Sequence, residues 1–123
     1  MRPGDSNLEI YLNDHLAGAT GGLALARRSR DSNRDTDLGA ELELLANEIA
    51  KDREALVSIM GHLDIRKDHV KIGLGWAAEK GGRLKLNGRL FGYSPLSRLL
   101  ELEALWIGVN GKLALWRALY QHA

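Results

Sequence analysis

Four stretches of the chain carry apolar residues at steps of three and four, the spacing of one face of an α-helix. The first face is Leu8, Leu12, His15, Ala19, Gly22 and Ala26. The second is the clearest stripe: Leu38, Leu42, Leu45, Ile49, Leu56, Met60 and Leu63. The third is Val70, Leu74, Ala77, Gly81 and Leu84, and the fourth is a wide arc of Leu96, Leu99, Leu100, Trp106, Ile107 and Leu113. These faces predict helices over about 7–29, 37–63, 68–87 and 95–121.

Capping signals support the predicted bounds of these helices. Thr36 or Asp37 provides the side-chain oxygen that caps the second helix, after a polar stretch at 29–37 that is typical of a loop. Ser94 before Pro95 is a capping hydroxyl followed by a proline in the first turn, where the missing N–H costs nothing. The connections between the predicted helices are therefore short.

The stretch at 83–91 supports two structures. Its residues alternate around Asn87-Gly88, the strongest short signal for a β-hairpin. Alternatively, Asn87 or Gly88 ends the third helix as a left-handed cap residue. We favour the helix end, because an isolated two-stranded hairpin is marginal in water and no other strand is predicted.

Length, charge and composition narrow the class of protein. A chain of 123 residues is the size of one domain, so we predict that 1–123 is a single all-α, antiparallel up-down-up-down four-helix bundle. The absence of cysteine excludes thiolate chemistry and Cys-based metal sites, and a net charge of +1 does not favour nucleic acid as a partner. The start of the chain lacks the apolar core of a signal peptide, and no apolar run is long enough to span a membrane. We therefore expect a cytoplasmic protein with no membrane partner.

Polar residues on the predicted inner faces fall at one height of the bundle. Counting along straight antiparallel helices places His15, Asp52 or Glu48, Lys80 and Glu103 in one layer near its middle, to within about one turn of ~5.4 Å. Asn110 falls inside the apolar arc of the fourth helix, as Glu103 and Arg117 do. Buried polar groups are costly unless they are paired, so each of these residues needs a partner.

This layer has two main interpretations. The one we favour is a buried network of hydrogen bonds and ion pairs that fixes the register of the bundle and needs no cofactor. The alternative is a small-ligand pocket or a site for a single Fe, Mn or Zn ion, since imidazole and carboxylates suit these metals. The predicted ligands of that ion are His15, Glu48, Asp52 and Glu103. Lys80 at the same height would repel a cation.

A helical bundle with inward carboxylates resembles the ferritin-like superfamily, in a bacterial-type branch, over essentially the whole chain. In that superfamily the two-metal site is built from Glu on two helices and Glu-x-x-His on the other two. No Glu of this sequence is followed by His three residues later, and of the four histidines only His15 falls on an inner face. The resemblance therefore implies a ferritin-like bundle without di-iron chemistry.

Glycine makes up 14 of the 123 residues, above the ~7% average, and much of it falls inside predicted helices. The helical glycines of the first and third helices are Gly18, Gly21, Gly22, Gly73, Gly75, Gly81 and Gly82. Each costs about 1 kcal/mol relative to Ala, so something must offset it. We favour close helix crossing as the reason; the alternative is room for a ligand beside the helix.

A second set of apolar residues lies outside the predicted inner faces of the third and fourth helices. The predicted interface consists of Ile72, Trp76, Leu86, Leu90 and Trp116, with Leu105 and Leu119 also outside the arc of the fourth helix. A helix that is apolar on two sides is covered by a partner or is central to a larger core. Because homodimers are the commonest soluble oligomers, we expect a homodimer; a different protein as partner is the alternative. We find no motif for catalysis, and the sequence favours a non-catalytic, self-associating interaction or structural module.

Overall fold

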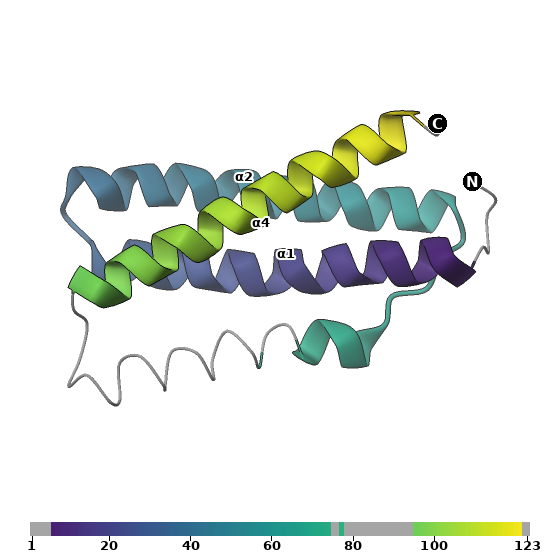
Figure 1. Cartoon of the computed structure of the whole chain (residues 1–123), viewed down its shortest axis with the longest axis horizontal. Coiled ribbons are helices and arrows are strands. Elements are labelled where there is room, and N and C mark those ends of the chain that lie inside the picture. Colours follow the sequence, from purple (N-terminus) through teal and green to yellow (C-terminus); the bar gives the residue numbers. More distant parts are fainter. Residues whose placement is uncertain (1–5, 75–76, 78–94, 122–123) are drawn as a thin grey trace.

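The computed structural model describes residues 6–74, 77 and 95–121 (Figure 1). They form the long helices α1 (Ser6–Ser32), α2 (Asp37–His62) and α4 (Pro95–Gln121), and a short helical segment at 69–74. No strand occurs among these residues, and the predicted all-α class, a bundle of about four helices, is confirmed. Most of the predicted third helix and the whole 83–91 stretch lie outside the described residues. None of the described helices is both long and apolar enough to cross a bilayer.

Helices α1 and α2 form a hairpin in which α2 runs back along α1 (Figure 1). The predicted cap of α2 is Thr36, whose Oγ1 accepts a hydrogen bond from the Gly39 amide at 3.0 Å. The same hydroxyl donates to the Asn33 carbonyl at 2.6 Å, and Asp35 takes a left-handed conformation with φ of 64°. Helix α1 continues to Ser32, so the predicted loop at 29–37 is shorter than expected.

Gly39 is a position at which any side chain would collide with the backbone. A Cβ at this position would lie 2.3 Å from the Asn33 carbonyl oxygen, well inside van der Waals contact. Because the turn brings the Asn33 carbonyl over the first turn of α2, only glycine fits beneath it without displacing the chain. Gly39 therefore sets how closely α1 and α2 approach at this end of the hairpin.

The buried apolar residues separate into two clusters along the hairpin. The first core cluster is Leu8, Leu12, Leu16, Leu56, Met60, Ile65 and Leu115. The second core cluster, nearer the α1–α2 turn, is Ala26, Leu42, Ala46, Ile49 and Leu105. The face predicted for α2 is confirmed, because Leu42, Ile49, Leu56 and Met60 are all buried. Helix α4 contributes one residue to each cluster and so closes both.

Helix α4 crosses the hairpin obliquely, with more of its contacts on α1 than on α2 (Figure 1). Its buried residues are Ser97, Glu101, Leu105 and Leu115. The predicted inner arc of this helix is wrong, because every one of its members is exposed: Leu96, Leu99, Leu100, Trp106, Ile107 and Leu113. The helix is apolar on two sides, and the side that packs is the one whose polar residues meet partners on the hairpin: Glu101 contacts Arg28, and Lys112 contacts Asp52.

The chain between α2 and the segment at 69–74 is held by Asn13 of α1. Its Nδ2 donates to the Arg66 carbonyl at 2.9 Å, and its Oδ1 accepts from the Asp68 amide at 2.6 Å. Asp68 begins the helical segment as predicted, since its Oδ1 accepts from the Lys71 amide at 3.1 Å. The predicted inner face of this segment is wrong, however. Val70 and Leu74 are exposed, whereas Ile72, expected outside, packs against the first core cluster.

Candidate functional site

A cleft of about 320 Å³ lies where α4 crosses α1 and α2. On one side its lining includes Ile49 and Leu105 of the second core cluster. On the other it includes Leu56 and Leu115 of the first core cluster. The cleft therefore occupies the gap between the two clusters, and most of its wall is apolar.

Four glycines line this cleft, two from α1 (Gly18 and Gly22) and two from α4 (Gly108 and Gly111). A Cβ built on any of them would meet no atom within 4 Å, apart from each helix's own neighbouring backbone. The predicted explanation of the helical glycines, close helix crossing, is therefore wrong for Gly18 and Gly22, and the same holds for Gly73. The missing side chains instead leave open space at the point where α4 passes over the hairpin.

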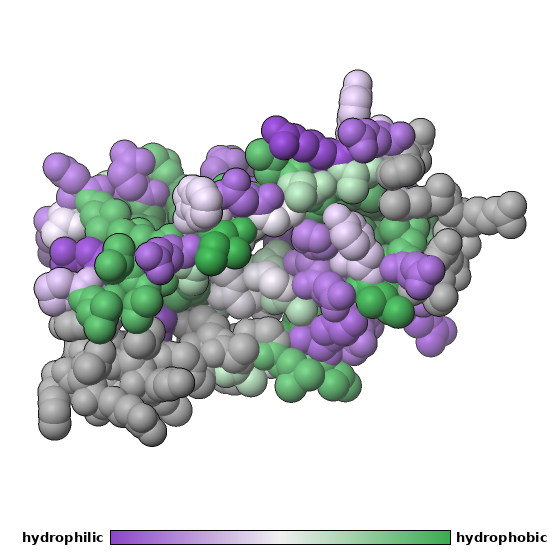
Figure 2. All heavy atoms as spheres, in the orientation of Figure 1, coloured by the Kyte–Doolittle hydropathy of each residue, from purple (hydrophilic) through white to green (hydrophobic). Residues whose placement is uncertain are grey.

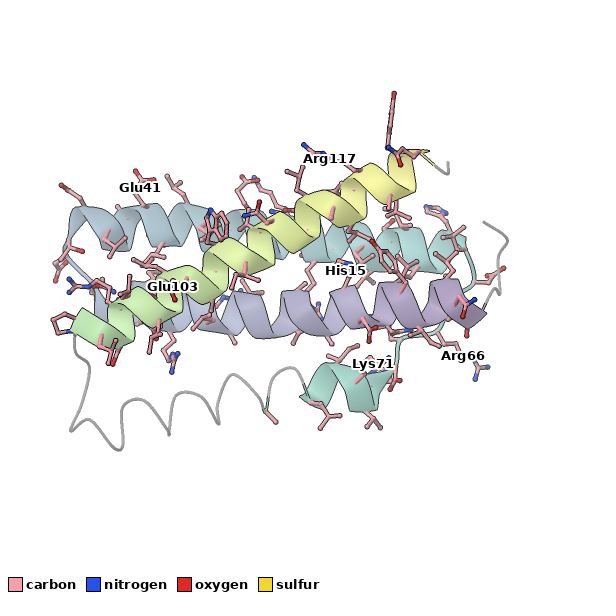
Figure 3. The ribbon with its side chains drawn as sticks, in the orientation of Figure 1. His15, Glu41, Arg66, Lys71, Glu103 and Arg117 are labelled. Atoms are coloured by element: carbon pink, nitrogen blue, oxygen red, sulfur yellow. The ribbon has the colours of Figure 1, made fainter. Side chains whose placement is uncertain are left out.

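Three of the residues that line the cleft carry polar groups that could contact a ligand: His15, Asp52 and Lys112. Asp52 of α2 and Lys112 of α4 form an ion pair with an N–O distance of 2.5 Å. The side chain of Asp52 is 30% exposed and that of Lys112 is 27% exposed. His15 of α1 (Figure 3) packs against the ring of Tyr11, and the two ring centroids are 4.7 Å apart. Burial lowers the pKa of His15 below its ordinary value, and the neighbouring Asp14 carboxylate opposes this effect. The cleft therefore contains the His15 imidazole, whose neutral form is favoured by burial, and the Asp52 carboxylate, whose charge is balanced by Lys112, beside apolar walls.

The structure brings together only part of the predicted mid-bundle layer. His15 and Asp52 both line the cleft, as their heights along the helices predicted. Glu48, Glu103 and Asn110 are exposed, so their predicted burial is wrong. Glu48 pairs with Lys51 at 3.6 Å, and the Asn110 amide donates to the Trp106 carbonyl of its own helix at 2.8 Å. Lys80 lies outside the described residues.

The partial layer also bears on the predicted metal ligands. Within the described part of the chain, no group of three or more His, Cys, Asp or Glu side chains is placed to hold a metal ion. Of the four predicted ligands, His15 and Asp52 share the cleft, while Glu48 and Glu103 are on the surface. Asp52 is already engaged by Lys112, whose ammonium would repel a cation.

Most of the buried polar residues that the sequence analysis missed lie where the start of α4 meets the end of α1. Arg28 of α1 and Glu101 of α4 form an ion pair at 2.7 Å, with side chains only 9% and 2% exposed. The Arg98 guanidinium donates to the Asn33 side chain at 2.9 Å, which ties the start of α4 to the α1–α2 turn. The available signal was a second stripe at helical spacing, in which small and polar residues alternate with leucine: Ser97, Glu101, Leu105, Gly108, Lys112 and Leu115.

The opposite side of α4 is an exposed apolar surface, which we call the outer face of α4. Its large apolar residues are between 37% and 86% exposed: Leu96, Leu99, Leu100, Trp106, Ile107, Leu113 and Tyr120. Glu103, Asn110 and Arg117 are the polar residues that share this face. Hydrophobic spheres gather at the left of the molecule where α4 begins (Figure 2).

The predicted interface residues do not coincide with this face. Trp116 is half-buried and packs against the first core cluster, as Ile72 does. Leu119 packs against the same cluster, and Leu105 is buried in the second. The side of α4 expected to be outside is therefore inside. Trp76, Leu86 and Leu90 lie outside the described residues.

Fold and surface together define this chain as an all-α helical-bundle protein with a glycine-lined cleft and an exposed apolar helix face. No family model matches the chain, and comparison with curated proteins and with solved structures gives no match. We therefore infer function from the geometry of the cleft and of the outer face of α4.

Proposed function

We propose that this protein is a non-catalytic, self-associating structural or interaction module, an antiparallel four-helix bundle with a ferritin-like layout. The observation that carries the proposal is the outer face of α4, where seven large apolar side chains follow one helix and remain exposed. Contiguous apolar surface of this kind marks interaction sites in soluble proteins, because each Leu, Ile or Phe-sized side chain gains about 1.5–3 kcal/mol on full burial. The proposed partner surface is therefore the outer face of α4 rather than the side of α4 that carries Trp116.

A second copy of the chain is the partner that the charges of this face favour. The face carries one carboxylate, Glu103, and one guanidinium, Arg117, near opposite ends of α4 (Figure 3). Such a face can neutralise its own charges when it meets itself in the opposite direction. Symmetric dimers with the same patch on both subunits are also the commonest soluble assemblies.

Sedimentation equilibrium at micromolar concentration tests self-association. The wild type should sediment as a dimer, and Trp106→Glu should shift it toward monomer because it places a charge in the proposed interface. Leu44→Glu is the matched control, since Leu44 is similarly exposed but lies on α2. A wild type that stays monomeric at 100 times that concentration overturns the proposal, and a complex with a different protein would then be the remaining use of the face.

The cleft supports a second candidate function, binding of a small and largely apolar molecule. The observation that favours it is the open space at four glycines, each of which costs helix stability of about 1 kcal/mol without packing in return. Pockets with apolar walls and a few converging polar groups are the usual form of small-molecule sites. The His15 imidazole would hydrogen-bond a polar group of the ligand. A single Fe, Mn or Zn ion is the weaker form of this candidate, because only two predicted ligands, His15 and Asp52, line the cleft, and they share it with the Lys112 ammonium.

A neutral fluorescent probe, N-phenyl-1-naphthylamine, tests the cleft. Wild type should enhance its emission saturably, and Gly108→Leu should abolish the enhancement by filling the cleft. Gly61→Leu is the matched control, because Gly61 is equally open but does not line the cleft. Equal enhancement by all three proteins excludes the cleft as the site. Elemental analysis of protein purified without a histidine tag tests the metal form.

A further inference from the structure

The outer face of α4 is organised as three parallel columns of residues. The central column repeats every seven residues and contains Leu96, Glu103, Asn110 and Arg117. One flanking column is Leu99, Trp106, Leu113 and Tyr120, and the other is Leu100, Ile107 and Ala114. Every residue of the three columns is exposed. The polar residues thus lie along the middle of the face, with apolar residues on both sides.

The central column is self-complementary about Asn110. Glu103 precedes Asn110 by seven residues and Arg117 follows it by seven, about 10.5 Å along the helix in each direction. When two α4 helices pair antiparallel about a two-fold axis at Asn110, each Glu103 faces Arg117 of the second copy. A parallel pairing would instead bring Glu103 against Glu103 and Arg117 against Arg117.

The flanking columns fit the same symmetry. Because the two-fold axis brings each flanking column against its own copy, Trp106 would lie beside Leu113 of the second copy. In the other column, Ile107 would lie beside Ala114 of the second copy, so a larger residue meets a smaller one on both flanks. In paired helices, a central Asn fixes the register and complementary charges fix the direction of pairing.

We propose that two copies of this chain associate through α4 in an antiparallel arrangement, with the two-fold axis at Asn110 and reciprocal Glu103–Arg117 ion pairs. This inference rests on the proposed self-association and adds the direction and register of the contact. The Asn110 side chain donates one N–H within its own helix and keeps its carbonyl oxygen and second N–H for the other copy.

Disulfide trapping tests the register directly, because the chain contains no cysteine. In Asn110→Cys the two thiols would face each other across the axis, and copper phenanthroline should convert most of the protein to a covalent dimer. Asn47→Cys, an exposed residue of α2, is the matched control and should stay monomeric on denaturing gels. If the Asn110→Cys variant crosslinks no more than the Asn47→Cys variant, the proposed register is overturned.

A charge exchange tests the direction of pairing. Glu103→Arg or Arg117→Glu alone should raise the dimer Kd at least about tenfold, because each creates two like-charge contacts. The double variant Glu103→Arg with Arg117→Glu should return the Kd to within about threefold of wild type, since the reciprocal pairs are restored with reversed sign. Circular dichroism checks that each variant remains helical. A double variant as weak as either single variant overturns antiparallel pairing.

These measurements separate the register from the proposed function. A dimeric wild type without trapping at Asn110 and without charge rescue overturns the register and leaves self-association standing. A wild type that is monomeric by sedimentation overturns both. A dimer that shows trapping and rescue supports both.

Discussion

Helices α2 and α4 have similar lengths, 26 and 27 residues, yet they use their apolar residues in opposite ways. In α2 the single leucine stripe turns inward and fills both core clusters. In α4 the longer apolar face is exposed, and the inner face carries Ser97, Glu101 and Lys112 among its contacts. When a helix carries a single apolar stripe, that stripe determines which side of the helix packs in the core. When a helix is apolar on two sides, its contacts with the rest of the fold determine which side packs.

The largest expected effect concerns the two glutamates of α4. Glu101→Leu should destabilise the protein by about 3–5 kcal/mol, because it leaves the Arg28 guanidinium buried without its carboxylate. Glu103→Leu should change the free energy of unfolding of the monomer by less than about 0.5 kcal/mol, since Glu103 is exposed. Urea denaturation of both variants measures the difference. Equal effects would contradict the rotation of α4 described above.

A pair of leucine truncations compares the two apolar faces. Leu56→Ala in α2 should cost about 2–5 kcal/mol, because Leu56 is only 2% exposed and its removal leaves a cavity. Leu99→Ala in α4 should cost less than about 0.5 kcal/mol in the monomer, because Leu99 is 54% exposed. The measurement is urea denaturation below the concentration at which any dimer forms. If the Leu99 variant lost as much as the Leu56 variant, the outer face of α4 would be part of the core.

Two glycines give an opposite pair of effects. Gly39→Ala should destabilise the hairpin by about 1–3 kcal/mol, since its Cβ would overlap the Asn33 carbonyl. Gly108→Ala should stabilise α4 by about 0.5–1 kcal/mol, because its Cβ enters open space and the helix gains a better helix former. Thermal unfolding of the two variants gives the sign. A destabilised Gly108 variant would show that the cleft closes in solution.

The smallest expected effect is the pH dependence that comes from His15. Because burial lowers the pKa of His15 in the folded protein below 6.5, the unfolded chain binds the proton more readily. The contribution of His15 to the free energy of unfolding should therefore be complete above pH 6.5. It should decline as the pH falls from 6.5 through the lowered pKa of the folded protein. His15→Gln should remove this part of the slope, whereas His62→Gln, outside the cleft, should retain it. An unchanged slope in the His15 variant would show that His15 is fully solvated.

The bounds of α2 and α4 followed from the sequence because helix ends are local features. Thr36 accepts a hydrogen bond from an amide three residues later, and Pro95 stands in the first turn of its helix. The rotation of α4 is different, since it depends on Arg28, which is distant in the chain. Glu101 and Glu103 are two residues apart, which places them about 200° apart around a helix. The incorrect prediction of the side of α4 that packs therefore assigned burial to Glu103 instead of Glu101.

The cleft, too, could be predicted from the sequence only in its local features. The heights of His15 and Asp52 along their helices were predictable, because the hairpin between them is short and regular. The meaning of the glycines was not, since a missing Cβ permits either close contact or open space. Only the path of α4 over the hairpin distinguishes the two.

The hydrogen bond between Asn33 and Arg98 joins residues 65 positions apart and has a consequence for the order of folding. The α1–α2 turn closes a short loop at small entropic cost, so the hairpin can form early. Docking of α4 must close a much longer loop before Arg98 and Glu101 reach their partners on the hairpin. We therefore expect the α1–α2 hairpin to form first. Asn33 and Arg28 would then already be in position to bind Arg98 and Glu101 when the start of α4 docks. Truncation of Glu101 should then accelerate unfolding far more than it slows folding.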